Sequence, residues 1–199
     1  MQTKGKIFLG HGDIANYITL LGLILSLSSC FCALNGNIQL SVTFFIVSGI
    51  CDLFDGAVAR RIKRTDWEKE FGVQLDTVAD VVSFGAAPVI IVFATAGKSW
   101  YALAAYAFYI VCAVIRLAHF NTSVNINTSI THYQGLPVTY IALILPIAMI
   151  FRSAPASVLT LFIVGILFIL YIKIPKPQGI WYVIFPALAV ALSVLWWIL

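Results

Sequence analysis

Long apolar stretches separated by short polar connections run through the whole chain. We place them at residues 16–34, 39–61, 72–95, 100–121, 136–151, 155–173 and 179–199. About 20 apolar residues in helical conformation are needed to cross the hydrocarbon core of a bilayer. Short connections such as Asn35-Gly36-Asn37 are typical of turns between such helices. The pattern therefore predicts an all-α polytopic membrane protein, a bundle of about six to seven transmembrane helices.

Composition supports the same class. The chain has 199 residues, of which 61% are hydrophobic and only 10% charged, with a mean hydropathy of +1.00. So few polar residues do not suffice to cover the core of a water-soluble domain. We expect a single transmembrane domain over residues 1–199, preceded by no cleavable signal. The alternation of lysines and apolar residues in positions 1–15 predicts a short interfacial segment or a disordered terminus.

The basic residues are unevenly distributed between the two ends of the predicted spans. If the N-terminus is cytoplasmic, nine fall on that side: Lys4, Lys6, Arg60, Arg61, Lys63, Arg64, Lys69, Lys173 and Lys176. The other side has Lys98 and Arg152. An excess of Lys and Arg marks the cytoplasmic side of membrane proteins. We therefore expect a multi-pass protein of the cell (cytoplasmic) membrane.

Four aspartates interrupt the second and third apolar stretches: Asp52, Asp55, Asp76 and Asp80. The charge distribution places them near the cytoplasmic end of these spans. An aspartate at the centre of a membrane helix costs about 2.5–3.5 kcal/mol on insertion scales, so such residues usually pair or serve a function. One aspartate paired with an arginine can simply hold two helices together. Four aspartates on two spans favour a site that faces the cytoplasm.

Helical periodicity gathers these aspartates with small residues. Positions three, four, seven and eight residues apart share one face of a helix. One such face carries Asp52, Asp55, Gly56, Ala59 and Arg60. The next carries Gly72, Asp76 and Asp80. Two adjacent helices can thus present carboxylates to each other across a polar crevice, in which the small residues leave room for a ligand.

The donor set indicates which cofactor such a crevice would hold. A ligand set of hard carboxylate oxygens, without His or Cys, suits Mg²⁺, Mn²⁺ or Ca²⁺ rather than zinc. Four carboxylates exceed the needs of one such ion, so we expect two divalent cations, an arrangement that serves phosphoryl displacement. The nearby basic run, Arg60 to Arg64, would attract phosphate or anionic headgroups, or would only set the membrane topology.

The order Asp52-x2-Asp55-Gly56-x2-Ala59-Arg60, followed by Gly72-x3-Asp76-x3-Asp80, resembles the signature of the CDP-alcohol phosphotransferases. Members of this family are integral-membrane enzymes that displace CMP from a CDP-linked lipid with an alcohol. The spacing departs from the family's pattern, because more residues than usual separate Arg60 from Gly72. We expect the additional residues in a polar loop, 64–70, which leaves the carboxylates in place.

The resemblance implies a role for each residue of the signature. The metal ions would be held by Asp52, Asp55, Asp76 and Asp80. Asp80 would also act as the catalytic base on the acceptor hydroxyl. The CDP-linked lipid would bind against Gly56, Ala59, Arg60 and Gly72. The resemblance further implies a homodimer, and we expect no nucleic-acid partner.

Three further segments resemble membrane-integral phosphatidylserine synthases: residues 80–88 (DVVSFGAAP), 116–121 (RLAHFN) and 135–137 (GLP). His119 departs from them, since an arginine is usual there. The resemblance implies CDP-diacylglycerol and L-serine as substrates, with acceptor contacts from Ser83, Arg116 and Asn121. Arg116 could instead extend to the membrane surface, and Ser83 and Asn121 could hydrogen-bond between helices.

Alternatives to this function remain at this point. The same chemistry could use glycerol phosphate or an inositol phosphate as acceptor, or an archaeal ether-lipid CDP donor. A divalent-cation transporter is the alternative of another class. The clustering of the carboxylates at one membrane end argues against it, as do the small residues beside them. The polar segment 122–135 is predicted to form a flap at the mouth of the site.

Overall fold

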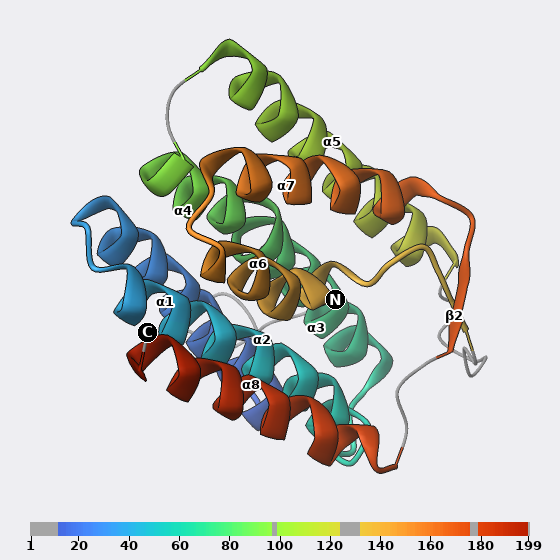
Figure 1. Ribbon diagram of the computed structural model, residues 1–199. Coiled ribbons are helices and arrows are strands. Elements are labelled where there is room, and N and C mark those ends of the chain that lie inside the picture. Colours follow the sequence, from blue (N-terminus) through green and yellow to red (C-terminus); the bar gives the residue numbers. More distant parts are fainter. Residues whose placement is uncertain (1–11, 97–98, 124–131, 176–178, 199) are drawn as a thin grey trace.

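The chain folds into a bundle of apolar helices (Figure 1). The computed structural model describes residues 12–96, 99–123, 132–175 and 179–198. The described α-helices are α1 (Ile14–Leu34), α2 (Ile38–Ala59), α3 (Asp66–Asp80), α4 (Ala87–Ala96), α5 (Trp100–Ser123), α6 (Ile141–Ile150), α7 (Ala154–Ile169) and α8 (Trp181–Ile198). A π-helical turn, η1 (Val81–Ala86), and a 3₁₀ turn, η2 (Val138–Tyr140), precede α4 and α6.

The predicted fold class is confirmed. Within the described residues five helices are long and apolar enough to cross a membrane, and α3, η1 and α4 form one of them, the continuous 31-residue helix Asp66–Ala96. Two shorter apolar helices, Val138–Ile150 and Ala154–Ile169, fall on the fifth and sixth predicted spans. Most of the expected interfacial segment, residues 1–11, lies outside the described part of the chain, as do residues 124–131 of the expected flap.

The predicted polar loop over residues 64–70 is wrong for most of its length, because α3 already begins at Asp66. Thr65 caps this helix: its side chain accepts a hydrogen bond from the Glu68 amide, and the Glu68 carboxylate accepts one from the Thr65 amide. Such a capping box satisfies two amides at the start of a helix. The polar residues after Arg64 therefore extend the helix that carries Asp76 and Asp80.

A short two-stranded antiparallel sheet was not expected from the sequence. Strand β1 (His132–Gln134) pairs with β2 (Lys173–Pro175), which follows α7. The backbone amide of Gly135 donates to the Ile172 carbonyl at 2.9 Å and continues this connection. The sheet thereby ties the segment before α6 to the end of α7.

Small residues allow the helices to approach closely. A Cβ atom added to Gly49 of α2 would lie 2.6 Å from the Cβ of Ala142 on α6. A Cβ on Gly22 of α1 would lie 3.1 Å from the Cβ of Cys51 on α2. Close backbone approach at small residues is the usual way in which membrane helices pack. This packing brings the polar half of α2 next to α1, α3 and α6.

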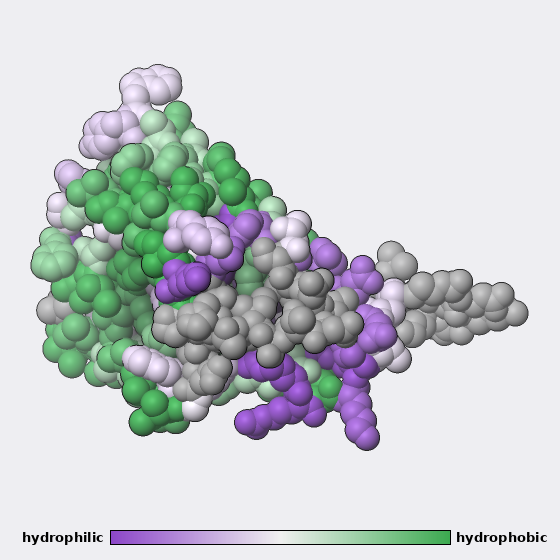
Figure 2. All heavy atoms as spheres, turned by 90° about the vertical axis from the view of Figure 1, so that its right-hand side faces the viewer, coloured by the Kyte–Doolittle hydropathy of each residue, from purple (hydrophilic) through white to green (hydrophobic). Residues whose placement is uncertain are grey.

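One end of the bundle is polar. Helix α2 ends there at Ala59, α3 begins there at Asp66, and Arg60, Arg61 and Lys63 lie between them. Figure 2 looks onto this end, where hydrophilic side chains gather next to hydrophobic surface. The aspartates lie on the half of α2, and on the half of the continuous helix Asp66–Ala96, that is nearer to this end. The fold therefore places the candidate site towards the polar end of the bundle.

Candidate active site

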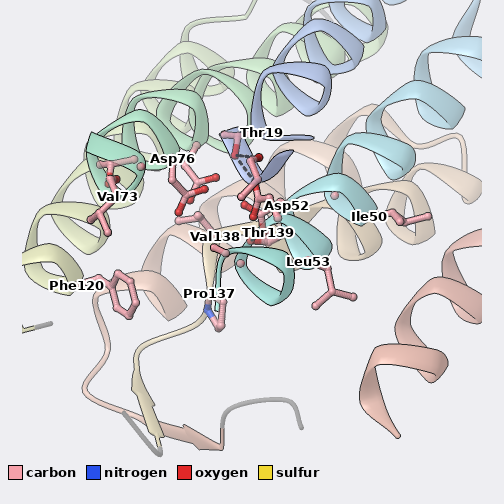
Figure 3. A pocket seen from close by; sticks show the side chains of 18 of the residues that line it. Thr19, Ile50, Asp52, Leu53, Val73, Asp76, Phe120, Pro137, Val138 and Thr139 are labelled. Atoms are coloured by element: carbon pink, nitrogen blue, oxygen red, sulfur yellow. Dashed lines mark hydrogen bonds between the residues drawn. The ribbon is translucent and has the colours of Figure 1, made fainter. Parts of the chain in front are cut away.

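A cavity of about 1010 Å³ opens between the helices at this end of the bundle. Its wall includes residues of α1, α2, α3, α5 and α8 and the segment around η2. Figure 3 shows Asp52 and Asp76 facing each other across it from α2 and α3, with Thr139 beside Asp52. All four predicted aspartates lie on its wall: Asp52, Asp55, Asp76 and Asp80.

Three of these carboxylates form a tight group. Asp52, Asp76 and Asp80 each offer one oxygen, and these oxygens lie within 4.8 Å of one another. Two unit charges at that distance repel by about 3 kcal/mol at an effective dielectric constant of about 20. Asp80 is only 9% exposed, so water contributes little to screening. The group therefore requires protons or a cation to hold its charges together.

The donor chemistry fits a divalent cation. All three candidate ligands are carboxylate oxygens, which Mg²⁺ and Mn²⁺ prefer. Asp76 Oδ1 is buried and accepts no hydrogen bond from the residues that the structure describes. A buried carboxylate oxygen without a donor is costly unless it has another positive partner. A cation between the three aspartates would supply that partner.

Two threonines hold the aspartates of α2 in place. Thr139 Oγ1 of η2 donates to Asp52 Oδ2 at 2.7 Å. Thr19 Oγ1 of α1 donates to Asp55 Oδ2 at 2.6 Å, and Asp55 is 5% exposed. Asp55 is not part of the group of three and lies one turn further along α2. Thr139 was not singled out from the sequence, since it is 87 residues away from Asp52.

The small residues of the signature also lie on the wall, namely Gly56, Ala59 and Gly72. The space beside Gly72 is already in use, because an added Cβ would lie 2.7 Å from Arg64 Nη1. The Arg64 side chain is 7% exposed. Its Nη1 lies 3.6 Å from Oδ2 of Asp13, the residue that caps α1. Gly72 therefore admits a buried guanidinium next to the cavity.

Arg60 is held by the last helix. Its Nη2 donates to the hydroxyl of Tyr182 at 2.7 Å, across 122 positions of the sequence. Both residues line the cavity, and Phe185 and Ala189 extend the α8 wall towards the interior of the bundle. The C-terminal helix thus orients a charged residue of the signature.

The predicted acceptor residues are only partly brought together. Arg116 and Asn121 of α5 line the cavity, and Arg116 is 6% exposed with its guanidinium 5.0 Å from the centre of the Phe120 ring. Asn121 donates to Thr77 Oγ1 of α3 at 2.7 Å. Ser83 is not on this wall: it is buried in η1, where its carbonyl accepts a hydrogen bond from Ser26 of α1.

The segment 135–137, which resembles a segment of phosphatidylserine synthases, has a structural explanation at its glycine. Gly135 adopts a φ of +74°, a conformation that favours glycine. A Cβ at this position would also collide with the carbonyl oxygen of Phe168 at the end of α7. Gly135 therefore turns the chain from β1 into η2, and this turn delivers Thr139 to Asp52.

Comparison with known proteins supports the family that the signature indicates. The family model for CDP-alcohol phosphatidyltransferases matches residues 13–195. A protein from Methanocaldococcus jannaschii named CDP-diacylglycerol–serine O-phosphatidyltransferase is 32% identical over 86% of this chain and 79% of its own length. A protein of the same name from Saccharomyces cerevisiae is 36% identical over 55% of this chain. An archaetidylserine synthase from Methanothermobacter thermautotrophicus is 26% identical over 76% of it.

The relatives differ in how much of their own length is matched. The alignments span 42% of the yeast protein and 64% of the Methanothermobacter protein. The family match, in contrast, covers nearly all of the described residues, including all four aspartates and the helix α8 that completes the cavity wall. The chain belongs to the CDP-alcohol phosphatidyltransferase family.

Proposed function

We propose that the protein transfers the phosphatidyl group of CDP-diacylglycerol to the hydroxyl of L-serine, giving phosphatidylserine and CMP. The observation that carries this proposal is the group of Asp52, Asp76 and Asp80 on the wall of a large cavity. The names of the relatives from Methanocaldococcus and yeast favour serine among the acceptors that the family uses.

Asp80 acts as the base in this proposal. The serine hydroxyl oxygen attacks the phosphorus that carries diacylglycerol, and the bond from this phosphorus to the oxygen of CMP breaks. The hydroxyl proton passes to the Asp80 carboxylate, and CMP leaves with the bonding electron pair. Asp80 is suited to this role because it lies deep in the cavity wall, at the end of α3. A base must lie within hydrogen-bonding reach of the proton that it removes.

Two divalent cations, Mg²⁺ or Mn²⁺, would complete the site. Asp52, Asp76 and Asp80 would hold them together with Asp55, which Thr19 orients from the next turn of α2. When bound, such cations neutralise the diphosphate and stabilise the charge on the leaving phosphate. The threonine hydroxyls keep the carboxylates in position, as residues that hydrogen-bond to metal ligands commonly do.

The donor would occupy the part of the cavity next to the end of α2. Gly56 and Ala59 leave room for the nucleotide, and Arg60, oriented by Tyr182, would contact its phosphates. Gly72 contributes indirectly, by admitting Arg64 to the wall. A volume of about 1010 Å³ is at the upper end of usual ligand pockets, as a nucleotide with a lipid headgroup requires.

Serine would approach from the side of α5. The buried guanidinium of Arg116 would pair with the serine carboxylate, since Arg and carboxylate form strong charge-assisted hydrogen bonds. Asn121, fixed by Thr77, offers a second polar contact. Ser83 remains a predicted acceptor contact that would require serine to reach η1 from the cavity.

The protein would lie in the cell membrane with the aspartates towards the cytoplasm, where CDP-linked lipids and serine meet. The basic residues Arg60, Arg61 and Lys63 at the polar end of the bundle support this orientation. The homodimer remains a prediction from the family, and cross-linking in native membranes would test it.

An acceptor panel tests the proposal. Purified protein with Mn²⁺ and CDP-diacylglycerol should release CMP when serine is added, and not with glycerol phosphate or an inositol phosphate. Preference for an ether-linked CDP donor would match the name of the Methanothermobacter relative and would change the donor but not the chemistry. Absence of CMP release with every acceptor, together with Mn²⁺ flux into proteoliposomes, would favour a transporter instead.

A further inference from the structure

The helix that carries Asp76 and Asp80 widens directly after Asp80. The α-helical pattern holds up to Val81, whose amide donates to the Thr77 carbonyl four residues back. In η1 the pattern changes, and the amide of Ala87 donates to the Val82 carbonyl five residues back. Single π-turns inside α-helices are rare and often occur at functional sites. This one begins directly after Asp80, the residue that the proposed mechanism uses as base.

Pro88 explains why the helix widens here. A proline has no amide hydrogen, so Pro88 can donate neither to the carbonyl of Phe84, four residues back, nor to that of Ser83, five residues back. Its ring also clashes with the carbonyl four residues back in a regular α-helix. A π-turn before Pro88 relieves this clash.

Two side chains from other helices satisfy these two carbonyls. Tyr109 Oη of α5 donates to the Phe84 carbonyl at 2.6 Å, and Ser26 Oγ of α1 donates to the Ser83 carbonyl at 3.3 Å. Tyr109 and Ser26 are both 0% exposed, and the Tyr109 ring packs on Phe168 with the ring centres 5.4 Å apart. Buried carbonyls of this kind must be hydrogen-bonded, or the turn would not be stable.

The turn sets the rotation of the aspartates relative to the bundle. A π-turn contains one residue more per hydrogen-bonded ring than an α-turn, and one residue corresponds to about 100° of rotation in an α-helix. The helix after the turn is fixed in the core by Ala87, Ile91 and Val92, each at most 1% exposed. If η1 closed to an α-turn, the rotation would fall on α3, and Asp76 and Asp80 would leave the cavity.

We propose that Tyr109 is a positioning residue for Asp76 and Asp80, which acts by holding the Phe84 carbonyl and thereby keeping η1 open. Ser26 has the same role with a longer hydrogen bond. This inference rests on the proposed function for its kinetic test. It also predicts cation binding by the aspartates, which can be measured without substrate. It gives residues 81–88, which follow the proposed base, a role in the geometry of the site.

The test compares three variants of the full-length protein in detergent. Tyr109→Phe keeps the ring and removes the hydroxyl, and should weaken Mn²⁺ binding and lower kcat about tenfold each, the lower end expected for a residue that supports metal ligands. Pro88→Ala supplies an amide at position 88 that can bond to the Phe84 carbonyl in an α-turn. We expect it to unfold at the same or a higher temperature than the unsubstituted protein and still to bind Mn²⁺ more weakly, by about tenfold.

The double variant Tyr109→Phe/Pro88→Ala separates positioning from stability. It should regain the thermal stability lost in Tyr109→Phe, because the Phe84 carbonyl has a donor again, but not the kcat. Tyr106→Phe is the matched control: Tyr106 is 4% exposed on the same helix and packs against Phe93 of α4. If Tyr109→Phe does not fold, Ser26→Ala takes its place, with a smaller loss of Mn²⁺ affinity.

The results have distinct meanings. The inference is overturned if Tyr109→Phe binds Mn²⁺ and turns over like Tyr106→Phe, or if the double variant regains kcat together with stability. Wild-type Mn²⁺ affinity in Pro88→Ala would overturn it as well. If the unsubstituted protein releases no CMP, the proposed function fails, and the Mn²⁺ affinities of the variants still decide whether Tyr109 positions the aspartates.

Discussion

Replacement of Thr139 by valine isolates the contribution of one hydroxyl to the metal site. Valine has nearly the same shape as threonine, so Thr139→Val removes only the hydrogen bond to Asp52 Oδ2 at 2.7 Å. A hydrogen bond to a charged group contributes about 1.5–3 kcal/mol, and both residues here are half-buried. We take the lower value, which corresponds to about a tenfold change, since 1.4 kcal/mol is a factor of ten.

The assay is the Mn²⁺ dependence of CMP release with CDP-diacylglycerol and serine in excess. Thr139→Val should raise the Mn²⁺ concentration for half-maximal rate about tenfold, with a smaller change in the rate at saturating Mn²⁺. The control is Thr160→Val, which removes a hydroxyl that donates at 2.8 Å to the Ala156 carbonyl within α7. Equal Mn²⁺ dependence in the two variants would refute the view that Thr139 orients a metal ligand.

Two further substitutions test the packing and the donor site. Gly49→Ala should lower the free energy of unfolding by about 1–3 kcal/mol, because the new Cβ would lie 2.6 Å from that of Ala142 and α2 and α6 must separate; thermal unfolding measures it. Tyr182→Phe should raise KM for CDP-diacylglycerol about threefold to tenfold at nearly constant kcat, since a partly exposed hydrogen bond to Arg60 is lost. Tyr101→Phe, at an exposed tyrosine near the start of α5, is the control. An equal KM for CDP-diacylglycerol in Tyr182→Phe and Tyr101→Phe would contradict the view that α8 orients Arg60.

The hydrophobic pattern was sufficient to predict the helices, because a membrane span is defined by its own length and composition. The π-turn and the early start of α3 were not predicted. The start of α3 depends on the capping residues Thr65 and Glu68. In the sequence these two residues stand among other polar residues, so the stretch resembles a loop. Pro88, inside an apolar helix, was the signal for the π-turn. A proline there leaves backbone carbonyls without an amide donor, but the sequence does not tell which side chains donate to them.

The candidate site was predictable where its residues share a helical face, and not where distant segments meet. Asp76 and Asp80 are one turn apart, so periodicity placed them together. Thr139 is 87 positions away from Asp52, and Tyr109 is 25 positions away from Phe84. Contacts between such distant positions depend on tertiary packing. Ser83 illustrates the converse case, since a motif position next to Asp80 is buried away from the cavity wall.

Incorporation of labelled serine into lipid tests the central claim most directly. The unsubstituted protein and Asp80→Asn are compared with CDP-diacylglycerol and Mn²⁺, and CMP is measured in the same samples. The account predicts one phosphatidylserine for each CMP with the unsubstituted protein, and loss of both products in Asp80→Asn with binding of CDP-diacylglycerol largely retained. Equal turnover in Asp80→Asn, or CMP release without labelled lipid, would contradict it.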